Sequence, residues 1–149
     1  IHFMKIYALP FLLLAFLNLS GWENDFDTAK QKARDQHRFI LLEFSGSDWC
    51  IPCIRFRKEV LETNEFTKFA DTSLVLLNAD FPRLKKNQLP KTQQQKNDQL
   101  ADRYNPTGIF PLTILLDANG NKLKTWEGYP DLNSEEFISQ INQYRNARN

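Results

Sequence analysis

Residues 39–53 read FILLEFSGSDWCIPC, and the fold can be predicted from this segment. Its first six residues form an apolar run broken by one carboxylate, and a small, turn-forming stretch follows at 45–47. This length and this exit favour a buried β-strand. After the two cysteines, residues 54–70 carry apolar side chains near one face and charged ones largely opposite, which predicts a helix with a break near Thr63 and Asn64. The cysteines therefore lie where a strand turns into a helix.

The sequence pattern on either side of this segment predicts more helices and strands. Helices are expected at residues 25–38, 93–104 and 133–144, the last opened by a capping box of Asn133 and Glu136. Strands are expected at 74–79, 112–116 and 122–126, with a hairpin turn at 117–120. The strand–helix–strand units predict parallel pairing, and the hairpin adds an antiparallel edge. The fold class is thus α/β, a mixed sheet of four to five strands with helices on both faces.

One segment between these elements stands out by its composition. Residues 81–104 are longer and more basic than a minimal fold of this kind needs, and 81–96 are rich in lysine and glutamine. The ordinary interpretation is a solvated insertion, and a surface for a partner is the alternative.

Composition excludes several classes of protein. A length of 149 residues allows one domain and a leader, and a net charge of +1 gives no electrostatic basis for binding nucleic acid. Two cysteines three positions apart are too few for a disulfide-rich scaffold or a four-cysteine zinc site. His2 and His37 are the only histidines, so no metal site and no cofactor are expected.

The N-terminus has the pattern of a targeting segment. A positive charge at Lys5 precedes the apolar run from Ile6 to Leu19, which is short for a membrane span and typical of a secretory signal. Residues 1–21 are predicted to be a signal peptide, or an uncleaved N-terminal membrane anchor, and residues 22–149 the folded domain. Both alternatives place the domain in the periplasm or outside the cell, and contact with a membrane is expected only for the anchor.

The position of the two cysteines points to redox chemistry. A Cys-x-x-Cys pair alone is a weak signal, because zinc sites use it too. At the first turn of a helix, however, free backbone amides and the helix dipole favour the thiolate, which is the form that attacks disulfides. We expect Cys50, nearer the exposed tip, to be the nucleophile, and Cys53, one turn inward, to be the resolving thiol of an exchange through a mixed disulfide.

Trp-Cys-x-Pro-Cys after a buried strand, with a late proline before another strand, resembles the thioredoxin superfamily. The chain is similar to secreted bacterial thioredoxin-like proteins and to the reductase domain of thiol:disulfide interchange proteins, over roughly residues 26–144. The resemblance implies a thioredoxin-like fold, a redox disulfide between Cys50 and Cys53, and a cis peptide at Pro111. It also implies that the backbone of Phe110 pairs with bound substrate. From chemistry alone, Pro111 could simply start a strand.

Two further residues have roles that the resemblance implies. Trp49 matches the aromatic residue beside the first cysteine, where it contacts substrate, and a core or lid aromatic is the plainer interpretation. Glu43 lies on the strand where thioredoxins carry a buried acid that handles the proton of the resolving cysteine. Burial would raise its pKa, whereas a solvent-facing position would make it an ordinary strand residue. The lysine that often accompanies this acid is replaced by Leu76.

These observations predict an extracytoplasmic protein thiol–disulfide oxidoreductase. Its partners would be protein thiols and disulfides and a redox protein that recycles the site. Ile51 adds no charge that would stabilise the thiolate, which favours a reductase or general exchange over a strong oxidase. The alternatives are a binding adaptor or chaperone without turnover, for which a second cysteine is unnecessary, and a metal-delivery protein, which lacks further soft ligands nearby.

Overall fold

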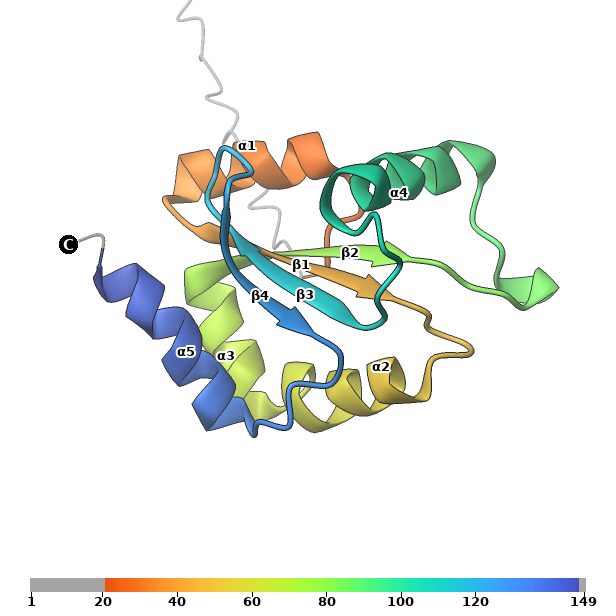
Figure 1. Cartoon of the computed structure of the whole chain (residues 1–149). Helices are drawn as coiled ribbons and strands as arrows, with labels where there is room; N and C mark the ends of the chain where they lie inside the picture. The colour runs from red at the N-terminus through yellow and green to blue at the C-terminus, as the bar shows by residue number, and fades with distance from the viewer. Residues whose placement is uncertain (1–20, 148–149) are drawn as a thin grey trace, which may run out of the picture.

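The strand predicted just before the cysteines is β1 (Phe39–Ser45), and it lies inside a four-stranded sheet. The computed structural model describes residues 21–147 (Figure 1). The strand order is β2-β1-β3-β4, with β2 at Leu74–Asp80, β3 at Leu112–Leu116 and β4 at Lys122–Glu127. The predicted fold class, an α/β protein with a mixed sheet, is confirmed, with four strands.

One expectation about strand direction is wrong. β1 and β2 are parallel as predicted, but β3 runs antiparallel to β1, although a helix separates it from β2. The reason lies in the segment before β3. It returns the chain to the end of the sheet where β2 finished, since the rings of Phe81 and Phe110 lie 5.6 Å apart. Starting from that end, β3 has to run in the opposite direction.

Helices cover both faces of the sheet (Figure 1). On one face lie α1 (Phe26–Gln36) and α4 (Lys91–Tyr104), and on the other α2 (Ile51–Phe56), α3 (Asn64–Ser73) and α5 (Ser134–Asn146). Successive side chains of a strand point to opposite faces. Ile40, Leu42 and Phe44 accordingly pack with α1 and α4, whereas Leu41 packs with the other three helices. Glu43 therefore points toward α2.

The helix that follows the cysteines is divided, as the sequence predicts. α2 continues into a π-helical turn, η1 (Arg57–Leu61), and α3 begins after Thr63, whose Oγ1 accepts a hydrogen bond from the amide of Phe66. α4 begins at Lys91, two residues before the predicted start. The segment between β2 and α4 contains only a short 3₁₀ turn, η2 (Lys85–Asn87).

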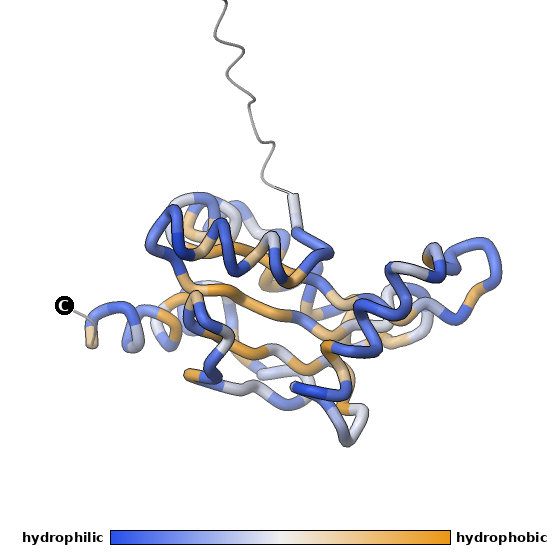
Figure 2. The backbone as a smooth tube through the Cα atoms, turned by 90° about the horizontal axis from the view of Figure 1, so that it is seen from above, coloured by the Kyte–Doolittle hydropathy of each residue, from blue (hydrophilic) through white to orange (hydrophobic). Residues whose placement is uncertain are grey.

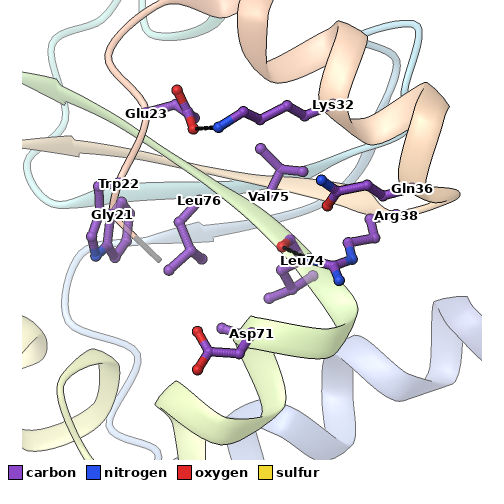
Figure 3. A pocket seen from close by; sticks show the side chains of 11 residues that line it. Gly21, Trp22, Glu23, Lys32, Gln36, Arg38, Asp71, Leu74, Val75 and Leu76 are labelled. Atoms are coloured by element: carbon purple, nitrogen blue, oxygen red, sulfur yellow. Dashed lines mark hydrogen bonds and ion pairs between the residues drawn. The ribbon is translucent and has the colours of Figure 1, made fainter. Parts of the chain in front are cut away.

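The N-terminal edge of the described chain pairs with the outer strand. Glu23 forms a parallel bridge with Leu77, donating from its amide to Leu76 and accepting from Asn78. An ion pair between Glu23 and Lys32 of α1 holds this segment (Figure 3). The predicted signal or anchor, residues 1–21, falls almost entirely outside the described residues. Within 21–147, no helix has the length and apolar character that crossing a membrane requires.

Candidate active site

Cys50 and Cys53 form a disulfide at the start of α2, with an S–S length of 2.11 Å. The loop before them is closed by a 2.9 Å hydrogen bond from the Cys50 amide to the Gly46 carbonyl. Cys50 occupies the N-cap position, and its Sγ accepts a 3.3 Å hydrogen bond from the Cys53 amide. Pro52 lies within the first turn of α2, where no intrahelical acceptor awaits an amide hydrogen. The local sequence thus places the backbone amide of Cys53 within hydrogen-bonding distance of Cys50 Sγ.

The two cysteines differ in surroundings more than in exposure. Cys50 is 4% exposed and Cys53 is 2% exposed, so the predicted contrast between an exposed and an inner thiol is small in this oxidised form. Ile51, between them, is 65% exposed and presents an apolar side chain to solvent. The two sulfurs therefore differ mainly in the side chains that pack on either side of the motif.

On one side, Trp49 lies against aromatic residues from two other segments. Its indole nitrogen donates a 2.7 Å hydrogen bond to the Phe81 carbonyl, and its ring meets that of Phe110 edge-on at 5.4 Å. The Phe110–Pro111 peptide is cis. Gly46 supports this arrangement because a Cβ there would clash with the indole ring of Trp49. The structure thus brings together Trp49, Phe81 and Phe110, which come from three separate segments of the sequence.

On the other side, Glu43 is fully buried on the face of β1 that α2 covers. Its Oε2 accepts a 3.1 Å hydrogen bond from Nη2 of Arg57, which comes from the π-helical turn. Burial raises the pKa of Glu43 to about 7, even though Arg57 acts in the opposite direction; Asp80 and Glu62 reinforce the rise. Near neutral pH the carboxyl can therefore both take up and release a proton.

The cation beside the buried acid comes from an unexpected place. The sequence shows Leu76 where thioredoxins often carry a lysine, and Leu76 packs among apolar residues at the edge of the core. Arg57 instead reaches Glu43 from the helix side, and its guanidinium lies 4.9 Å from the ring centroid of Trp22. Sequence reasoning did not find Arg57, because the pairing depends on how η1 packs over β1.

A second residue missed from the sequence is Thr113. Among the described residues, two buried side-chain oxygens make no hydrogen bond, namely Glu43 Oε1 and Thr113 Oγ1. Glu43 and Thr113 are directly opposite each other in the β1–β3 register. A hydroxyl at this position of an otherwise apolar strand was the available signal. Glu43 thus keeps one carboxyl oxygen free for a proton.

Solvent reaches this side of the motif through a hollow of about 540 Å³. Cys53 and Arg57 line it together with Asp80, Glu62 and Lys58. A separate pocket of about 390 Å³ lies at the outer edge of β2, and neither cysteine lines it (Figure 3). Residues 21–147 contain no cluster of metal-binding side chains. The arrangement suits a thiol pair with a proton acceptor on its inner side.

Comparison with known proteins agrees with this geometry. A family described as thioredoxin-like matches residues 21–118. The disulfide bond reductase DsbH of Chlamydia pneumoniae is 39% identical over 128 residues, covering 86% of this chain and 74% of its own length. The thioredoxin-related protein DsbJ of the same organism is 35% identical over 95 residues, 64% of this chain but only 26% of DsbJ.

A solved structure extends the likeness to three dimensions. The structure named DsbH oxidoreductase superimposes with a TM-score of 0.73 at 34% identity, covering 83% of this chain and 82% of that one. The family match, the relative and the cysteine pair on a thioredoxin-like sheet agree with one another. The chain belongs to the thioredoxin-like family, and it is a thiol–disulfide oxidoreductase of that family.

Proposed function

We propose that this oxidoreductase works as a reductase of protein disulfides outside the cytoplasm, with Cys50 as nucleophile and Cys53 as resolving thiol. The observation that carries the proposal is the asymmetry around the Cys50–Cys53 disulfide. The Cys53 amide donates a hydrogen bond to Cys50 Sγ. Glu43, a buried carboxyl of raised pKa, pairs with Arg57, which lines the same hollow as Cys53. The two thiols are thereby suited to different steps.

The first step uses the thiolate of reduced Cys50. It attacks one sulfur of a substrate disulfide, so that a Cys50–substrate disulfide forms and the other substrate sulfur leaves as a thiolate. The amide of Cys53 and the helix dipole stabilise the Cys50 thiolate before attack. Trp49 and Phe110 flank this sulfur and would contact the incoming polypeptide, whose strand pairs with the backbone before Pro111.

The second step releases the substrate. Cys53 passes its proton to Glu43, and the resulting thiolate attacks the Cys50 sulfur, forming the intramolecular disulfide and expelling the second substrate thiolate. Two electrons leave the protein in total, so a dithiol reductant has to return two electrons and two protons. Glu43 Oε1, which has no partner within the described chain, is the acceptor we assign to the Cys53 proton.

Two different observations support the direction of the reaction, which is reduction, and the compartment in which it takes place. The relative DsbH is named a disulfide bond reductase, and no charged side chain stands between the cysteines here. The apolar run at residues 6–19 supports a location in the periplasm or outside the cell. Protein disulfides are the proposed substrates, and a redox protein is the proposed source of electrons.

Insulin reduction tests this proposal. The purified domain with dithiothreitol should precipitate insulin at least about 100-fold faster than Cys50→Ser or Cys53→Ser, and only Cys53→Ser should accumulate a covalent adduct with substrate. Equilibration with glutathione buffers measures the standard reduction potential of the Cys50–Cys53 pair. For a reductase, this potential should lie below that of the glutathione pool.

Contrary results are easy to recognise. A wild-type rate equal to that of both variants would leave a binding adaptor as the better description. A pair that glutathione reduces readily would reverse the direction to that of an oxidase.

A further inference from the structure

The segment between β2 and α4 has an unusual charge. Residues 81–96 contain five basic residues and no acidic one. Since the whole chain has 19 basic and 18 acidic residues, the remainder carries a net charge of −4. We call residues 81–91 the basic arm. It is a largely hydrophilic projection from the body of the molecule (Figure 2) and extends from the end of the sheet that carries the cysteines (Figure 1).

The basic arm is fastened to the loop that precedes Cys50. Asp48 accepts 2.9 Å hydrogen bonds from the amides of Arg83 and Leu84 and a 3.1 Å bond from the side chain of Asn87. These hydrogen bonds hold the pKa of Asp48 below its usual value, with the Arg83 amide as the main cause. Trp49 adds its bond to the Phe81 carbonyl. The arm therefore has a fixed position beside the motif.

Within residues 21–147, no ion pair joins a cation of the arm to a carboxylate. Arg83 places its guanidinium 3.6 Å from the centroid of the Trp49 ring, which leaves its charge at the rim of the site. Lys85, Lys86 and Lys91 are exposed, and none belongs to an ion pair within residues 21–147. Asp48 accepts hydrogen bonds from the arm, and Asp80 and Asp98 line a hollow together with other residues of the arm. The exposed lysines and Arg83 thus place a cluster of cations beside the Trp49 side of the motif.

An apolar side chain accompanies these charges. Leu84, at the start of the 3₁₀ turn, is 48% exposed. Together with Ile51 it offers apolar contact to a chain lying across the motif, while the lysines offer charge to the flanks of that chain. Surface cations steer opposite charge toward a site and raise its association rate, mostly at low ionic strength.

We propose that the basic arm selects protein substrates in which acidic residues flank the disulfide. This inference rests on the proposed function, since it concerns the partners of that same site. An acidic polypeptide is favoured over other anions because the arm is attached to Trp49, the residue next to the nucleophilic thiol. Lys85 and Lys86 contact the acidic flank, and Arg83 supports both the flank and the Trp49 ring.

The test uses three short peptides that carry the same mixed disulfide with a fluorescent thiol. Glutamates flank the disulfide in one, serines in the second and lysines in the third. Wild-type protein should react faster with the acidic than with the basic peptide. The variant Lys85→Gln/Lys86→Gln should lower this ratio at least about fivefold at low salt, because it removes both the attraction to the acidic peptide and the repulsion of the basic one. Salt should shrink the difference.

A matched control removes the same charge elsewhere. Lys68 on α3 and Lys122 on β4 are exposed and lie outside the arm. Lys68→Gln/Lys122→Gln should keep the wild-type ratio. Equal ratios for arm and control variants would overturn the proposal, as would a wild type that does not distinguish the peptides.

A binding measurement separates this proposal from the proposed function. An acidic peptide without cysteine should shift the amide resonances of residues 83–88 in the oxidised protein, and a basic peptide should not. If all three disulfide peptides react no faster than with Cys50→Ser, the reductase function fails, while these shifts still decide whether the arm binds acidic chains. Absence of the shifts would contradict the arm's role even in an active reductase.

Discussion

The two sides of the Cys50–Cys53 motif differ in burial and in the kinds of side chain that they contain. On the Trp49 side, aromatic rings and unpaired cations lie at the surface, and the contacts come from a loop. On the Cys53 side, a carboxyl is fully buried between a strand and a helix, and an arginine is its ion-pair partner. An exposed side can recognise a partner without affecting proton transfer. A buried side can hold a proton near neutral pH without depending on the partner.

The largest effect is expected on the buried side, from Glu43→Gln. Removing the proton acceptor should slow resolution of the mixed disulfide by on the order of 100-fold at neutral pH. The measurement is single-turnover release of substrate from the Cys50 adduct across pH 5 to 9, roughly the range that brackets the raised pKa. A variant profile that overlays the wild type would remove Glu43 from the mechanism.

Glu43→Gln should slow resolution, but the same substitution should increase the stability of the fold. The pKa of Glu43 is about 7 in the fold against an ordinary value of 4.5, so the folded state binds the proton more tightly than the unfolded state. Stability contributed by the protonated form is therefore lost as pH rises from the lower value through the higher one. Relative to wild type, Glu43→Gln should gain about 3 kcal/mol of unfolding free energy across that interval. Denaturant titrations of the oxidised proteins at the two ends would measure it.

A smaller effect is expected from Arg57→Gln. Arg57 lowers the pKa of Glu43 against the effect of burial, so its loss should raise that pKa further. Less carboxylate is then present at neutral pH, and resolution should slow by about fivefold while the midpoint of the pH–rate profile moves upward.

Arg55→Gln provides the control, because Arg55 is exposed on the same helix and pairs with Glu59 instead. It should leave the midpoint unchanged. An equal shift in both variants would mean that general charge, rather than the ion pair with Glu43, sets the midpoint.

The smallest effect is expected on the exposed side, from Asp48→Ala. Loss of the acceptor should loosen the basic arm, so the amide hydrogens of Arg83 and Leu84 should exchange about fivefold faster. Disulfide exchange with a neutral peptide should change less than this. Asp98→Ala, an exposed acid on α4, should leave both amides protected as in wild type. Unchanged exchange in Asp48→Ala would show that contacts other than those of Asp48 hold the arm, such as the bonds from Trp49 to Phe81 and from Phe81 to Ser45.

Local signals made much of the fold predictable. The capping box of Asn133 and Glu136 opens α5 with both reciprocal hydrogen bonds, because its partners are three residues apart. The break near Thr63 is also local, since its side chain caps α3. The direction of β3 was not predictable in the same way. It depends on where a long connection returns the chain, which no short pattern encodes.

The residues of the site also fall into two groups: those that local sequence predicts and those that depend on tertiary packing. The cysteine pair could be placed because a strand, a turn and a helix follow one another in sequence. The burial of Glu43 stayed open, since both faces of β1 are covered and strand periodicity alone does not reveal that. Arg57 and Thr113 approach Glu43 from other elements of the fold. Their relation to it is tertiary, and only the packing of η1 and β3 reveals it.

The partnership of Glu43 and Arg57 also bears on how such proteins are compared with one another. In many thioredoxins the cation beside the buried acid sits on a strand, whereas here a leucine occupies that strand position and the charge comes from a helical turn. An alignment read column by column would report the pair as lost during divergence. Superposition of charged atoms would report it as retained. Surveys of this family that infer altered chemistry from a missing lysine should therefore inspect the turn after the second cysteine as well.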